Sequence, residues 1–211
     1  MTTSLIEASG PESEALYCAN MNLLAEKIID IYPENKHIEL HQRFTSICFY
    51  LKVVNETYQS IEKINRDIYF ENGYNQEQLY RCLIQYISSM DSVLDLLEKG
   101  SIKLSLNSVK RFERSQLKYN SILNTIRNFL MHDGIPFCRI DKNNSQGYVF
   151  QCADIAPIIE DKVSFSLKII FNSEKLQKDT FSLDDLLAIY KQFKQDIESY
   201  LALVLTDKKM I

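Results

Sequence analysis

An arginine, an amide and a histidine lie close together between residues 125 and 134, and their side chains are the ones best suited to chemistry. Asn128 follows Arg127 directly, and His132 comes shortly after. An arginine can grip a phosphate through two N–H groups, and a histidine can exchange a proton near neutral pH. RNA cleavage without a metal needs a base for the 2′-hydroxyl, a cation on the phosphate and a proton for the departing 5′-oxygen. We therefore interpret Arg127 as a phosphate clamp, His132 as base or acid, and Asn128 as a donor that orients either.

Helical geometry separates the arginine from the histidine. Asn128 and His132 are four residues apart and share a helix face, whereas Arg127 lies about 140° round from His132 on an ideal helix. The two meet over one phosphate if the arginine stem bends across Met131, if the last turn loosens, or if a second protomer supplies one of them. One histidine also cannot easily perform both proton transfers. We therefore expect a symmetric homodimer that brings two arginines and two histidines together.

The segment that carries these residues has the pattern of an amphipathic helix. Gly134 suits the left-handed residue that ends a helix, and Pro136 cannot continue one, so His132 is predicted in the final turn. The negative end of the helix dipole there favours an imidazolium. The apolar sector consists of Tyr119, Ile122, Leu123, Ile126, Phe129 and Leu130.

Long helices are predicted on both sides of this segment. Apolar residues recur at helical spacing from Glu14 to Ile31, and an alternation of four and three runs from about 38 to 69, interrupted where Asn65 takes one slot. The same alternation continues from Leu79 to Gly100 and returns over 186–204 after a cap at Ser182. A third long helix, which carries the motif, is expected over about 108–133. This pattern predicts a helical bundle.

Between Gly134 and the last helix the apolar period changes to two. Residues 137–140, 148–152 and 163–171 are predicted strands, with a turn at 143–147. The simplest arrangement is a three-stranded antiparallel meander that packs its apolar side on the bundle. We expect residues 1–12 to be a flexible N-terminus, 13–206 to be a single helical domain with a β insertion at about 136–172, and 207–211 to be a C-terminal tail.

Composition describes an ordered globular chain. The 211 residues are 45% hydrophobic and 25% charged, with five scattered cysteines that form neither a zinc pattern nor a disulfide framework. No apolar run reaches about 18 residues, and residues 1–10 lack the centre of a signal peptide, so we expect a soluble, cytoplasmic protein that does not enter membranes. The net charge of −4 argues against coating nucleic acid by bulk electrostatics.

Two further groups of residues bear on binding. His37 and His41 are four apart and share a helix face, as a metal would require, but no third ligand is evident, so no metal or other cofactor is predicted. The most basic part of the chain leads into the motif, and its residues are either a local RNA site or ordinary solvated positions. They are Lys103, Lys110, Arg111, Arg114, Lys118 and Arg127.

The motif and the order of helices resemble the HEPN superfamily, whose marker is an arginine, often followed by a polar residue, then four to six residues, then a histidine. The resemblance covers residues 37–205. It implies a mainly α fold: an up-and-down bundle of four to five helices, here with a small antiparallel β-meander inserted before the last helix. For Arg127, Asn128 and His132 it implies phosphate binding, site positioning and proton transfer.

The function that this resemblance implies is metal-independent endoribonuclease activity at a dimeric site, in a toxin or an antiphage or stress-defence effector. RNA, a second copy of the chain and an antitoxin or regulatory protein are then the expected partners. One subgroup has a tyrosine two residues after the histidine, where this chain has Gly134, so regulation by modification of that tyrosine is not expected. The alternative is a HEPN-like bundle without catalysis that serves as a nucleotide-binding or protein-interaction module.

Overall fold

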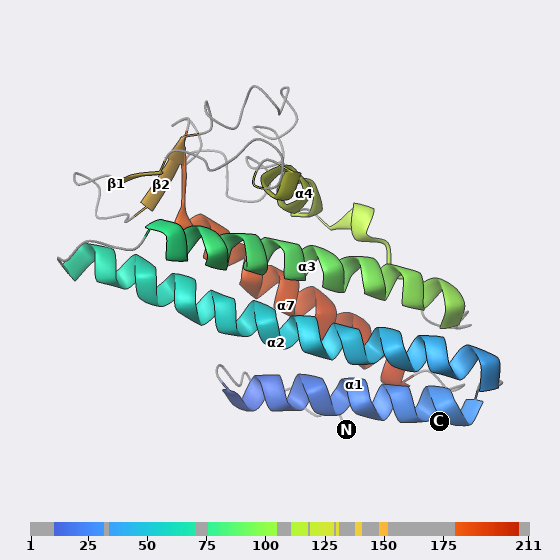
Figure 1. The fold of residues 1–211 in the computed structure, drawn as a ribbon. Coiled ribbons are helices and arrows are strands. Elements are labelled where there is room, and N and C mark those ends of the chain that lie inside the picture. Colours follow the sequence, from blue (N-terminus) through green and yellow to red (C-terminus); the bar gives the residue numbers. More distant parts are fainter. Residues whose placement is uncertain are drawn as a thin grey trace.

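The fold was analysed in a computed structural model that describes residues 11–31, 34–70, 76–104, 111–117, 119–128, 130, 138–140, 148–151 and 180–206. Four long helices form a bundle: α1 (Pro11–Ile31), α2 (Glu34–Phe70), α3 (Gln76–Leu104) and α7 (Leu183–Thr206). Figure 1 shows α2 between α1 and α3, with α7 running behind them. The four long helices expected here from apolar spacing are confirmed.

The core follows the predicted alternation of four and three. Side chains of α2, α3 and α7 at these positions are almost fully buried, because each helix turns one apolar stripe toward its neighbours. Gly100 does not end α3, which continues to Leu104. The largest fully buried side chains are Tyr86, Tyr119, Phe193, Met21, Leu24, Ile28, Leu40, Ile47, Ile61, Leu79 and Leu83.

The one interruption in the α2 stripe has a structural explanation. Asn65 is 5% exposed, and its side-chain amide donates a 2.8 Å hydrogen bond to Oδ1 of Asp184 in the first turn of α7. A buried polar group is tolerated where it finds such a partner. Asn65 therefore connects α2 to the start of α7 at a position where an apolar residue could not.

The third long helix predicted over about 108–133 is wrong. Residues 111–113 have no regular secondary structure, η1 (Arg114–Gln116) is a single 3-10 turn, and α4 (Asn120–Asn128) is a short helix. The backbone N–H groups of Phe112 and Arg114 donate to side chains of α3, Ser101 Oγ at 3.1 Å and Glu98 Oε1 at 3.1 Å. These long-range acceptors replace helical hydrogen bonds, so residues 111–117 cross α3 before α4 begins. We call residues 111–117 the connector.

The predicted β-meander insertion at about 136–172 is also wrong, because the described chain is dominated by helices and its strands are only three or four residues long. They are β1 (Cys138–Ile140), β2 (Tyr148–Gln151) and β3 (Thr180–Ser182), paired antiparallel in the order β1-β2-β3. The third strand leads directly into α7, outside the predicted insertion, and the strand predicted over 163–171 lies outside the described residues. An alternating pattern reports local preference, whereas the tertiary partner decides which segment pairs.

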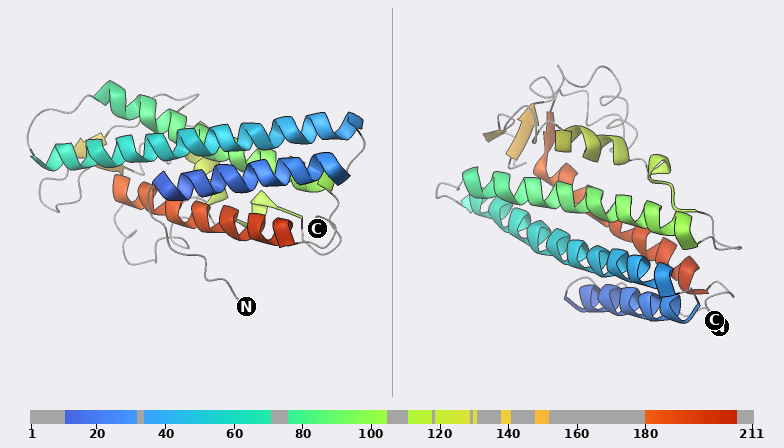
Figure 2. Two further views of the ribbon diagram at one scale, coloured as in Figure 1. Left: turned by 90° about the horizontal axis from the view of Figure 1, so that it is seen from below. Right: turned by 45° about the vertical axis from the view of Figure 1, so that its right-hand side comes forward.

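α4 lies against α3 on the side away from α1 and α2 (Figures 1 and 2). Its buried residues Leu123 and Ile126 belong to the common core, as do Tyr119 before the helix and Leu130 after it. The predicted apolar sector of this segment is confirmed at these four positions. Within the described residues, every helix is too short or too polar to span a bilayer.

Candidate functional site

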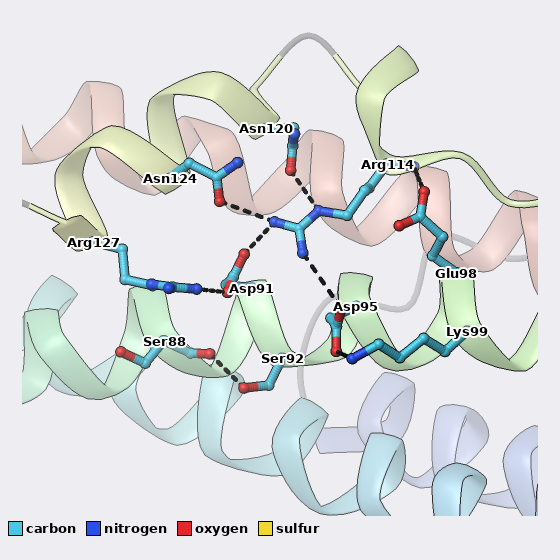
Figure 3. A network of polar contacts seen from close by, with 10 residues as sticks. All are labelled: Ser88, Asp91, Ser92, Asp95, Glu98, Lys99, Arg114, Asn120, Asn124 and Arg127. Carbon is cyan, nitrogen blue, oxygen red and sulfur yellow. Dashed lines mark hydrogen bonds and ion pairs between the residues drawn. The ribbon is translucent and has the colours of Figure 1, made fainter. Parts of the chain in front are cut away.

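A polar cluster forms where the connector and α4 cross α3 (Figure 3). We call it the Asp91 cluster, after the acid at its centre. Asp91 stands in the middle of α3, its side chain is only 8% exposed, and it accepts hydrogen bonds from two arginines. The remaining members surround these arginines. The cluster comprises Asp91, Asp95 and Glu98 of α3, Arg114 of the connector, and Asn120, Asn124 and Arg127 of α4.

Arg114 is the most enclosed cation of the Asp91 cluster. Its Nη2 donates to Oδ1 of Asp91 and, at 2.9 Å, to Oδ1 of Asn124. Its Nε donates to Oδ1 of Asn120 at 3.0 Å, and its Nη1 lies 4.0 Å from Oδ1 of Asp95. The Arg114 side chain is 17% exposed. The guanidinium is thus surrounded by oxygen acceptors on two helices, which fixes the connector against both.

Arg127 approaches the same carboxylate from the other side. It lies in the last turn of α4, where the helix dipole favours a cation, and its Nη1 donates to Oδ2 of Asp91. Its side chain is 40% exposed, so the contact with Asp91 anchors a side chain that is still partly open to solvent. Among the residues that the structure describes, Asp91 is the polar partner found for Arg127. This combination of fixed position and open donors suits an anion-binding group.

The sequence-predicted site residues are placed only in part. Arg127 lies in α4 beside Asp91, as described above. Asn128 is the last residue of α4, and its side chain is outside the described part of the structure. His132 lies outside the described residues altogether. The expected meeting of Arg127, Asn128 and His132, within one chain or across a dimer, therefore stays a prediction.

The basic stretch before the motif is not one exposed face. Arg111 is exposed, whereas Arg114 is turned inward to Asp91, and the side chains of Lys103, Lys110 and Lys118 are outside the described residues. The interpretation as ordinary solvated positions is therefore wrong for Arg114, and a local RNA site in this stretch stays a prediction. The Arg114 guanidinium is paired with the carboxylates of α3.

The histidine pair of α2 gains no further ligand. His37 is half-buried and His41 is exposed, and within the described ranges no three His, Cys, Asp or Glu side chains gather in a way that could hold a metal ion.

Aromatic side chains pack Phe112 and Tyr119, which lie on either side of η1, against α7. The ring of Tyr119 contacts Phe193 of α7 edge to face, with centroids 6.4 Å apart, and Phe112 contacts Tyr200 at 4.9 Å. Burial raises the pKa of the Tyr119 hydroxyl, and the nearby Asp196 carboxylate raises it further. Tyr119 therefore stays neutral and acts as a packing residue.

Sequence reasoning missed Asp91 and the role of Arg114, although one signal was present. The helix α3 carries a second stripe, spaced by seven, in which Tyr80, Ile87 and Leu94 are buried, and Asp91 occupies the slot between the last two. A second buried stripe predicts that another element covers the helix, and an acid within it predicts a cationic partner from that element. Nothing in the local sequence identifies which arginine this is.

No protein-family model, curated protein or solved structure matches this chain.

Proposed function

We propose that the protein is a metal-independent endoribonuclease in which Arg127 binds the scissile phosphate and His132 transfers a proton. The observation that carries the proposal is the state of Arg127, whose guanidinium is held by a buried carboxylate while 40% of its side chain remains exposed. An arginine fixed in this way loses little side-chain entropy when it binds a phosphate, and its planar fork matches the phosphate oxygens.

Asp91 has a positioning role in this proposal. The carboxylate accepts from Nη1 of Arg127, and 40% of the Arg127 side chain remains exposed and could meet a phosphate. It also accepts from Arg114, so the charge of the carboxylate is shared between two arginines. A phosphate that approaches Arg127 then competes with a carboxylate that Arg127 already shares with Arg114.

The proposed reaction follows from the residue types. His132 takes the 2′-hydroxyl proton, the 2′-oxygen attacks the adjacent phosphorus, and the bond to the 5′-oxygen breaks. Arg127 stabilises the charge that develops on the phosphate, and a second acid, His132 of another copy in a homodimer, protonates the departing oxygen. The products are a 2′,3′-cyclic phosphate and a 5′-hydroxyl. The resemblance to HEPN toxins and defence effectors extends the proposal to a cytoplasmic, homodimeric effector restrained by an antitoxin or regulatory protein.

The test is RNA cleavage by the purified protein in excess EDTA, with product ends identified. We expect cleavage by the wild type and a loss of about 100-fold or more with Arg127→Ala or His132→Ala, the range found for removing one group that stabilises a transition state. Arg111→Ala is the matched control, because it removes an exposed arginine from the neighbouring segment. Equal inactivity of folded wild type and variants across varied RNAs would refute the proposal.

A second candidate function is a non-catalytic nucleotide-binding or protein-interaction module. The charge balance of the Asp91 cluster favours it, because Asp91, Asp95 and Glu98 offset the two arginines. If its charges are balanced within the chain, the Asp91 cluster has a structural role alone, which is to hold α4 against α3. Retained RNA or nucleotide binding without cleavage, unchanged by His132→Ala, is the result expected for this alternative.

A further inference from the structure

We propose that Arg114 is a positioning residue that holds Arg127 in place through the carboxylate of Asp91. The inference rests on the proposed function for its effect on catalysis, whereas the coupling between the two arginines stands on the geometry alone. Arg114 is mostly enclosed: its Nε and Nη2 donate to Asn120, Asn124 and Asp91, and its Nη1 lies 4.0 Å from Asp95. Its effect on the site therefore passes through Asp91.

The two oxygens of Asp91 are divided between the two arginines. Oδ1 accepts from Nη2 of Arg114, and Oδ2 accepts from Nη1 of Arg127. Because both oxygens belong to one planar group, the contact at Oδ1 fixes the rotation of the carboxylate and therefore the direction in which Oδ2 points. Figure 3 shows Arg114 reaching down from the connector and Arg127 from the end of α4, with Asp91 between them.

Arg114 is itself held more firmly than Arg127. Its side chain is 17% exposed against 40% for Arg127, and its Nε and Nη2 donate to Asn120 and Asn124 at 3.0 and 2.9 Å. Its backbone N–H donates to Glu98 of α3 at 3.1 Å. The enclosed arginine is thus the fixed end of the chain of contacts, and the exposed arginine is the end that remains open to an anion.

Charge gives a second reason for the coupling. If Asp91 faced Arg127 alone, the pair would carry no net charge, and a phosphate would have to compete with the carboxylate. Arg114 takes one oxygen of that carboxylate, so the charge of Asp91 is shared between two cations, and Asp95, 4.0 Å from Nη1 of Arg114, offsets part of the charge that Arg114 adds. Lysine cannot replace Arg114 fully, because one ammonium cannot contact Asp91, Asn120 and Asn124 with the same fork geometry.

The test follows the Arg127 guanidinium by NMR in the full-length, ¹⁵N-labelled protein. The Nε–Hε signal of Arg127 is assigned by its loss in Arg127→Lys, and rotation about its Cζ–Nε bond is measured by exchange. We expect slow rotation in the wild type, faster rotation and a shifted signal in Arg114→Gln, and a smaller change in Arg114→Lys. The exposed Arg111 provides an internal reference for a free guanidinium, and Arg111→Ala is the control that should leave the Arg127 signal unchanged.

Each outcome decides the inference. If both Arg114 variants are folded by circular dichroism and the Arg127 signal is unchanged, Arg114 does not position Arg127 and the inference is overturned. If the wild type cleaves RNA, Arg114→Gln should lower kcat by about 10- to 100-fold with a smaller change in KM, because a positioning defect acts on the transition state; cleavage at the wild-type rate would overturn the catalytic part. Absence of cleavage by the wild type refutes the proposed function alone, since the NMR comparison still tests the coupling.

Discussion

Replacing Asp91 with alanine is expected to lower the free energy of unfolding by about 3–4 kcal/mol. The side chain is 8% exposed, and its removal leaves Arg114, at 17% exposure, without its buried countercharge. Removing one partner of a buried pair costs about 3–5 kcal/mol, and we take about 3 because Arg114 keeps its amide partners. Arg127 is 40% exposed, so solvent screens its pair and adds only about 0–1 kcal/mol.

Urea denaturation at neutral pH, followed by far-UV circular dichroism, measures this change. For a chain of 211 residues, the loss corresponds to a fall in Tm of about 10 °C, at about 2–4 °C per kcal/mol. Glu77→Ala is the matched control, because Glu77 also pairs with an arginine of α3, Arg81, but their side chains are 71% and 75% exposed. That variant should lose less than about 1 kcal/mol. If Asp91→Ala costs no more than Glu77→Ala, the Asp91 cluster does not hold α4, and the argument built on it fails.

Three other changes test the packing around the site. The contribution of the buried tyrosines to the free energy of unfolding should be fully present below pH about 10, the ordinary pKa of tyrosine. Above that pH it should fall by up to about 1.4 kcal/mol per pH unit for each buried tyrosine, because the unfolded side chain ionises while the folded one does not. Tyr119→Phe should make this fall shallower in urea titrations from pH 8 to 11. Asn65→Ala should lower the free energy of unfolding by about 1–2 kcal/mol, because it breaks the hydrogen bond to Asp184. Asn65→Leu should lower it by less, because leucine fills the apolar slot. Equal losses of stability in thermal melts of the two variants would contradict this. Gly100→Ala should raise stability by about 0.5–1 kcal/mol, since the added methyl group would meet Phe44 at an ordinary 3.8 Å, and a lower Tm would refute the packing argument.

The long helices could be predicted because their determinants are local. An alternation of four and three places the core residues of α2 on one face whatever the partner is, and Asn65, which interrupts it, needs a contact from another helix to explain it. The same reasoning identified Arg127 as a candidate, since an arginine at a helix end is visible in the sequence. The sequence could therefore predict the long helices of the scaffold, whereas the role of Arg127 stays a prediction.

The connector and the sheet could not be predicted because distant residues determine them. Phe112 leaves the helical conformation where Ser101, eleven residues earlier, accepts its N–H, and Arg114 does so where Glu98, sixteen residues earlier, accepts its own. Strand β3 pairs with β2 across about 30 residues, which no alternating pattern specifies. Asp91 was missed for the same reason, since its partner Arg127 is 36 residues away.

The short length of α4 has a consequence for how the protein unfolds. Nine residues form too few turns to be a stable helix in water, so α4 depends on its contacts with α3, the apolar ones and the shared carboxylate. The bundle of α1, α2, α3 and α7 has a large core of its own and does not need α4 to the same degree. We therefore expect α4 to open as a separate cooperative unit, with amide hydrogens that exchange faster than those of α2 and α3. The protein could then release Arg127 from Asp91 while its bundle remains folded, so any partner that binds the detached form of α4 would separate the two residues without unfolding the chain.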